Sequence, residues 1–213
     1  MDLYDGDLRI CIANGETSQY GPIVVKTMLE VLAFLAQKGV THGDIKPANI
    51  LFDHQGRFYL TDFGLIGTLD SPRGYTISDL YAAPEAHHQK LSTKSDIWSL
   101  GVVVLDILKK RPEFPPPLCW MDQRKEYWRS ITDVARETSF LPRMLSTEPT
   151  QRDDAATYLN KFFPNDQCRW PFAEISSIDI DMVAMVERKQ AKRKPCRVLK
   201  RPRKSKKRKS LIQ

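Results

Sequence analysis

The segment THGDIKPANILF at residues 41–52, followed by TDFG at residues 61–64, decides how this chain is interpreted. In the first segment, Asp44 is followed by Lys46 and Asn49, two and five positions later. Either segment alone would be weak evidence, because an Asp in a loop is often a helix N-cap or a turn residue. The two segments together, in this order and at this separation, predict a site rich in carboxylate, amide and amine groups.

The residues between the two segments predict a β-hairpin. Residues 50–52 and 57–60 are short apolar runs, and the polar stretch DHQG at 53–56 between them is typical of a turn. A hairpin brings its two ends together, so we expect Asn49 and Asp62 to lie close in space although thirteen positions separate them.

The rest of the chain favours helices. Apolar residues recur at three- and four-residue spacing over 20–38, and Gly39 follows as a left-handed C-cap. Residues 96–109 are apolar enough for a helix buried at the centre of a domain. Further helices are expected over 126–137 and 152–163.

Three more motifs extend the pattern: YAAPE at 81–85, SDIWSLG at 95–101 and TQR at 150–152. Together with the first two segments, they resemble the eukaryotic protein kinase family in that family's own order, from about residue 1 to 163. The chain resembles the serine/threonine type, because Lys46 follows Asp44 where tyrosine kinases usually differ.

The resemblance implies the cofactors ATP and Mg²⁺ and transfer of the γ-phosphate to Ser or Thr hydroxyls of a protein substrate. Asp44 and Lys46 would be catalytic: Asp44 would orient the attacking hydroxyl, and Lys46 would offset charge on the transferred group. Asn49 and Asp62 would hold the magnesium ion, since Mg²⁺ prefers hard oxygen ligands. Lys46, Asn49, Leu51 and Asp62 would contact the nucleotide.

Other residues match structural positions of the family. His42 and Phe63 are expected to pack on each other beneath the site. Asp96 would accept hydrogen bonds from backbone N–H groups of the 41–52 loop, because a buried carboxylate must be satisfied. Glu85 and Arg152 would form a buried ion pair.

Gly43 departs from the family pattern, because many kinases carry Arg at this position. That Arg normally contacts a phosphate on the activation segment, here residues 65–82. We therefore expect constitutive or substrate-gated behaviour, and a longer protein that supplied a small lobe should be active without phosphorylation of this segment.

The sequence predicts an α+β, protein-kinase-like fold: a mostly α-helical large C-terminal lobe (1–172) with a short β-hairpin, a connector (173–187) and a disordered basic tail (188–213). No G-x-G-x-x-G or V-A-I-K motif precedes the lobe, so the small lobe is expected to be absent. The chain by itself should then bind ATP·Mg²⁺ weakly and transfer phosphate slowly. Two alternatives stay open: a non-catalytic, kinase-like nuclear interaction module with an exposed apolar surface, and a fragment of a longer protein.

Charge is divided unequally along the chain. Residues 188–213 hold 14 of the 33 Lys and Arg and none of the 26 Asp and Glu, so residues 1–187 carry a net charge of −7. The tail is typical of a nuclear localisation signal that binds an import receptor. Non-specific contact with nucleic acid, contact with acidic membrane lipids and a merely solvated tail are the alternatives.

The four cysteines, Cys11, Cys119, Cys168 and Cys196, are far apart and lack metal-ligand spacing, so free thiols are expected. No unbroken apolar run reaches the ~18 residues of a membrane span, so no membrane partner is expected.

Overall fold

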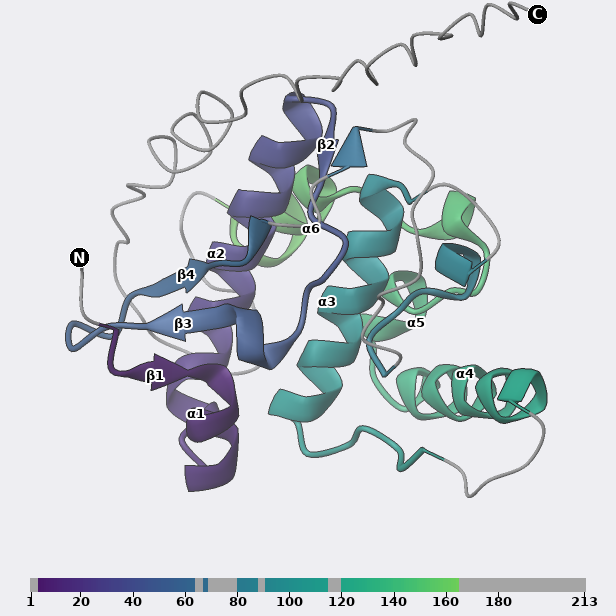
Figure 1. The fold of residues 1–213 in the computed structure, drawn as a ribbon, viewed down its shortest axis with the longest axis horizontal. Coiled ribbons are helices and arrows are strands. Elements are labelled where there is room, and N and C mark those ends of the chain that lie inside the picture. Colours follow the sequence, from purple (N-terminus) through teal and green to yellow (C-terminus); the bar gives the residue numbers. More distant parts are fainter. Residues whose placement is uncertain (1–3, 64–66, 69–79, 88–90, 115–119, 165–213) are drawn as a thin grey trace, which may run out of the picture. The chain divides into compact units, whose positions relative to one another are not determined.

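Helices make up most of the described part of the chain, accompanied by two small antiparallel sheets (Figure 1). The computed structural model describes residues 4–63, 67–68, 80–87, 91–114 and 120–164. All of them belong to one unit, residues 1–179.

The α-helices are α1 (Leu8–Asn14), α2 (Thr17–Gln37), α3 (Thr93–Ile107), α4 (Trp120–Arg136), α5 (Leu141–Met144) and α6 (Ala155–Phe162). The strands are β1 (Gly6–Asp7), β2 (Val40–Thr41), β3 (Ile50–Phe52), β4 (Phe58–Leu60) and β5 (Gly67–Thr68), and short 3₁₀ turns are η1 (Pro47–Asn49), η3 (Pro84–His87) and η4 (Pro149–Gln151).

Helix α2 is a core helix that packs against α3 and α6. It begins at Thr17, three residues before the predicted start, so Pro22 lies inside it. The predicted start was late because the chain enters α2 almost directly from α1, with only a turn at Gly15 (φ 77°) between them. Gly39 follows the helix with φ 64°, as predicted for a left-handed C-cap.

Helix α2 is also long and apolar enough to cross a membrane by length and composition, which the sequence reading did not anticipate. Its 21 residues include a window with a mean hydropathy of 1.2, of which 61% is buried inside the protein. A helix whose apolar residues already contact α3 and α6 has the burial pattern of a core helix, and that pattern accounts for its hydropathy.

The predicted hairpin is confirmed. Strands β3 and β4 pair antiparallel with Ile50 opposite Leu60 and Phe52 opposite Phe58, and β1 adds to the other edge of β3 (Figure 1). The turn is closed by Asp53, whose carboxylate accepts hydrogen bonds from the Arg57 guanidinium at 2.8 Å and the Tyr59 hydroxyl at 2.8 Å. The pairing of β3 with β4 therefore fixes the segment that ends at Asn49 relative to the segment that leads to Asp62.

Helix α3 runs through the core, and Trp98 on it is fully buried. It begins at Thr93, before the predicted residue 96, because Ser92 and Ser95 form a reciprocal capping box at its start. It ends at Ile107, and Lys109 then adopts φ 55°, a left-handed conformation usually given to Gly.

The last two predicted helices have different bounds in the structure. Helix α4 covers Trp120–Arg136, beginning six residues before the predicted 126–137. Helix α6 begins at Ala155 rather than 152, because the Asp154 side chain accepts a 2.7 Å hydrogen bond from the Thr157 N–H and caps the helix there. Arg152 is thereby left in extended backbone before the helix.

Among the described residues, the one large apolar side chain that is exposed is Ile10, at 44%. Of the cysteines, Cys11 is a buried free thiol, and its burial raises the pKa. The other three cysteines, the connector and the basic tail lie outside the described residues.

Candidate active site

Three predicted site residues meet in the loop after β2. Asp44 is buried, and its Oδ2 accepts hydrogen bonds from Lys46 Nζ at 2.7 Å and from Asn49 Nδ2 at 3.0 Å. Asn49 Nδ2 also donates to the Asp44 backbone carbonyl at 2.8 Å. The turn η1, begun by Pro47, folds the loop back on itself so that these side chains converge. The lysine keeps 24% of its side chain exposed, so the cluster reaches solvent on the Lys46 side.

A closed ring of hydrogen bonds joins this loop to the end of the hairpin. The Asp44 N–H donates to His42 Nδ1 at 3.2 Å, and His42 Nε2 lies 3.0 Å from the Thr61 carbonyl. With Nδ1 as acceptor, the neutral tautomer protonated at Nε2 satisfies both contacts. The Thr61 N–H donates to the Asn49 carbonyl at 2.9 Å, and Asn49 closes the ring on Asp44.

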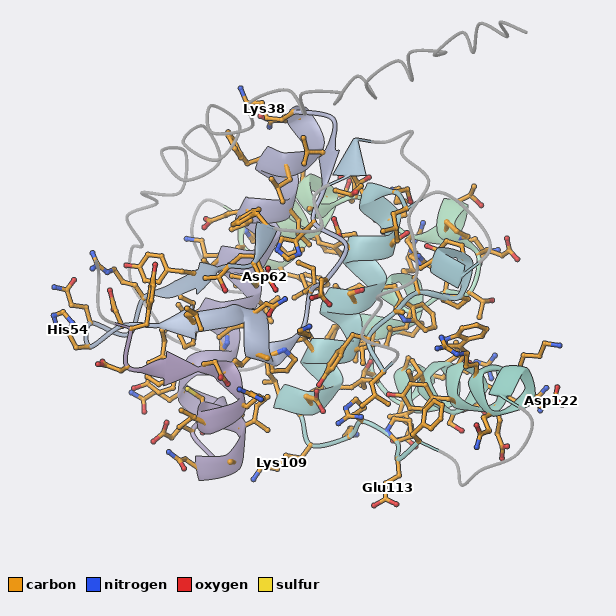
Figure 2. All side chains as sticks on the ribbon, viewed as in Figure 1. Lys38, His54, Asp62, Lys109, Glu113 and Asp122 are labelled. Carbon is orange, nitrogen blue, oxygen red and sulfur yellow. The ribbon has the colours of Figure 1, made fainter. Side chains whose placement is uncertain are left out.

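Asp62 follows this ring directly. It is exposed and has φ 60°, a left-handed conformation that Asp tolerates better than most residues. Figure 2 shows it at the inner end of the hairpin, whose outer turn carries His54. Phe63 is buried against His42 with ring centroids 5.1 Å apart, as predicted. The chain then returns as β5 and pairs with β2, which immediately precedes the loop.

Asp96 anchors the loop from helix α3, as predicted. Its two carboxylate oxygens accept the backbone N–H groups of His42 at 2.8 Å and of Gly43 at 2.7 Å. Gly43 has φ 73°, which a residue with a side chain adopts only at a cost. Glycine at this position therefore lets the loop take its shape with little backbone strain.

The predicted ion pair between Glu85 and Arg152 is present and buried. Arg152 donates two hydrogen bonds to the Glu85 carboxylate, at 2.6 and 2.9 Å, and its side chain has no exposed surface. The Ser95 hydroxyl donates to Glu85 at 2.9 Å, and the guanidinium lies 5.1 Å from the Trp98 ring. This cluster ties η3 and η4 to α3.

Sequence reasoning missed a second polar cluster around Asp106 at the end of α3. Asp106 accepts the Tyr81 hydroxyl at 2.6 Å and also the Arg111 guanidinium. The Tyr127 hydroxyl donates to the Leu80 carbonyl at 3.2 Å. Burial, and then the hydrogen bond to Asp106, raise the pKa of Tyr81. The cluster fixes the chain just before Pro84. No short sequence motif predicts it, because its members lie on separate elements.

The donor set around Asn49 and Asp62 fits a magnesium ion. Asn49 uses its amide nitrogen for Asp44, so its Oδ1 is the atom left to act as a ligand, and Asp62 offers an exposed carboxylate. Mg²⁺ is typically bound by one or two protein groups together with phosphates and water. Among the described residues there is no group of three or more His, Cys, Asp or Glu side chains that could hold a metal ion. Leu51 lies half-buried on β3, opposite Tyr59.

Comparison with known proteins gives one family. The model of the protein kinase domain matches residues 11–163. Calcium/calmodulin-dependent protein kinase type 1 of Caenorhabditis briggsae is 29% identical over 176 residues, which cover 71% of this chain and 46% of that protein. Serine/threonine-protein kinase PAK mbt of Drosophila melanogaster is 34% identical over 148 residues, which cover 64% of this chain and 23% of that protein. Serine/threonine-protein kinase PEPKR2 of Arabidopsis thaliana is 32% identical over 144 residues, which cover 61% of this chain and 30% of that protein. The chain thus spans about half the length of these relatives, or less.

Proposed function

Because the chain belongs to the protein kinase domain family, we propose that it acts as a serine/threonine kinase on protein substrates, with ATP as phosphate donor. The observation that carries this proposal is the cluster of Asp44, Lys46 and Asn49, which is hydrogen-bonded to Thr61, the residue directly before Asp62. Similarity to proteins named as serine/threonine kinases supports the same class of substrate.

The geometry suggests a role for each residue. The Asp44 carboxylate is held by Lys46 and Asn49, so it is oriented to accept a hydrogen bond from a substrate hydroxyl and to take its proton. The Lys46 ammonium, 2.7 Å from Asp44, is close enough to offset negative charge on the group being transferred. Both residues act as positioning and electrostatic groups, which is most of what phosphoryl transfer requires of a protein.

Asn49 and Asp62 would hold Mg²⁺, and Lys46, Asn49, Leu51 and Asp62 would line the nucleotide site. The bound ion would neutralise charge on the phosphates as it builds up. The chain's own contribution is to present an amide oxygen and a carboxylate from two ends of one hairpin, whose register is set by the pairing of β3 with β4.

Radiolabel transfer from ATP to a generic basic protein tests the proposal. Purified chain should transfer phosphate, and Asp62→Ala should abolish the transfer. His54→Ala, at the opposite end of the hairpin, is the matched control and should transfer normally. Transfer that survives Asp62→Ala would refute the proposed site, as would a chain that binds no ATP in the presence of magnesium.

We further propose that residues 1–172 form the large lobe of the kinase and that residues 188–213 direct the protein to the nucleus through an import receptor. The charge division between 1–187 and 188–213 supports this, since import receptors bind clustered Lys and Arg. A fluorescent fusion that ends at residue 187 should lose nuclear accumulation and keep its melting temperature. Unchanged localisation would refute the import role, and steeply salt-dependent DNA binding would then favour contact with nucleic acid.

A further inference from the structure

Thr61 is held between the two parts of the candidate site by three hydrogen bonds. Its carbonyl faces His42 Nε2 at 3.0 Å, and its N–H donates to the Asn49 carbonyl at 2.9 Å. Its hydroxyl donates to the same Asn49 carbonyl at 3.2 Å. The first two bonds use the backbone of Thr61 and do not depend on its side chain, whereas the third depends on the Thr61 hydroxyl.

The hydroxyl bond acts on the main chain of a candidate metal ligand. Asn49 is already fixed at its amide nitrogen, which donates two bonds to Asp44. The Thr61 hydroxyl adds a second donor at the Asn49 carbonyl, next to the junction of η1 and β3. Asp62 is the next residue after Thr61, so a shift of Thr61 would change the position of Asp62 relative to Asn49, the other candidate ligand.

We propose that Thr61 is a positioning residue for the metal ion: its hydroxyl sets the main chain of Asn49, and hence the distance between the Asn49 amide oxygen and the Asp62 carboxylate. This inference rests on the proposed function, because it assigns a role within that nucleotide and metal site. Neighbouring groups that orient a ligand typically affect metal affinity, although they do not touch the metal.

Thr61→Val removes the hydroxyl and keeps the β-branched shape, whereas Thr61→Ser keeps the hydroxyl. Thr27→Val is a matched control, because the Thr27 hydroxyl is buried in α2 without a hydrogen-bond partner in the described part of the chain. Binding of Mn²⁺ in the presence of ATP is measured by electron paramagnetic resonance of the free ion, relative to the same Mn²⁺ and ATP without protein. Binding of a fluorescent ATP analogue is measured in parallel in EDTA.

Thr61→Val should weaken Mn²⁺ binding by about threefold to tenfold, the effect of losing one hydrogen bond. Metal-free nucleotide binding should be unchanged, Thr61→Ser should lie within about twofold of wild type, and Thr27→Val should match wild type. The inference is overturned if Thr61→Val binds Mn²⁺ as wild type does, or if it weakens nucleotide binding equally with and without metal. A wild-type chain that binds no Mn²⁺ with ATP would instead reject the proposed function, and the role of Thr61 with it.

Discussion

The Asp44 cluster (Asp44, Lys46 and Asn49) and the Glu85–Arg152 cluster are both built on a buried carboxylate. They differ in the sequence separation of the bonded residues and in the solvent exposure of the basic partner. Asp44 bonds to residues two and five positions away, and its partner Lys46 remains partly exposed. Glu85 bonds to an arginine 67 positions away that has no exposed surface. The exposed side of Lys46 leaves the Asp44 cluster open to solvent, as the proposed catalytic role requires, whereas Glu85 is enclosed by its buried partner Arg152.

The largest expected effect is a loss of phosphate transfer on substitution of Asp44, which would distinguish the Asp44 cluster from the Glu85–Arg152 cluster. Asp44→Asn should lower phosphate transfer by roughly 10²- to 10⁴-fold, because the variant cannot take the substrate proton. Its stability should change little, since the amide keeps the size of the carboxylate. Transfer assays and urea unfolding measure the two quantities on the same preparation.

Asp53→Asn is the control for this first prediction, because Asp53 is also a buried acid, but its side chain is hydrogen-bonded to the hairpin turn and to Tyr59 on β4. It should keep full transfer at neutral pH. Equal loss of transfer in both variants would mean that phosphate transfer is sensitive to the loss of any buried acid near the hairpin. The specific role proposed for Asp44 would then be contradicted.

Arg152→Met tests the other side of the comparison. It should lower the free energy of unfolding by about 3–5 kcal/mol, because Glu85 would remain buried without its charge partner. Arg143→Met, which breaks an exposed ion pair with Asp153, should cost less than about 1 kcal/mol. Urea denaturation of both variants gives the two values, and equal costs would contradict the assignment of Arg152 to the scaffold.

The turn at Asp53 shows that a local cluster can also be structural. Burial raises the pKa of Asp53, but hydrogen bonds from Arg57, Tyr59 and the turn backbone outweigh it and hold the pKa at about 2, below the ordinary 3.8. A carboxylate with a lowered folded-state pKa stabilises the protein above its unfolded pKa, and this contribution is lost as pH falls through the folded value.

Stability should therefore fall by about 2 kcal/mol from this group between pH 5 and pH 2. Asp53→Asn should be less stable at neutral pH and should show a flatter decline over that window, as measured by urea unfolding at each pH. A decline as steep as that of wild type would show that other acids account for it.

The smallest predicted effect concerns backbone conformation alone. Lys109 follows helix α3 with φ 55°, so Lys109→Gly should raise stability by about 0.5–1 kcal/mol through relief of strain. Gly56→Ala, at φ 73° in the hairpin turn, should lower it by about 1 kcal/mol for the same reason. Thermal unfolding measures both, and a loss of stability in Lys109→Gly would show that the lysine side chain contributes more than the strain costs.

Parts of the molecule could be predicted because they depend on short separations. The hairpin follows from two apolar runs around a polar turn, and the loop after β2 folds back at Pro47 within six residues. Helix ends were predicted less well, because they depend on single capping bonds. Asp154 rather than Arg152 starts α6, and Ser92 starts α3 ahead of the predicted position.

The sequence by itself determined the family, the order of the motifs and the residues that crowd around Asp44, since these depend on spacing within a few positions. Only the tertiary structure decided that Tyr81, Asp106 and Arg111 form one cluster and that Thr61 closes a hydrogen-bond ring with His42. The physical reason is that a hydrogen bond needs its two atoms within about 3 Å. For residues on different elements, the packing of those elements brings the atoms that close, and no short pattern in the chain records it.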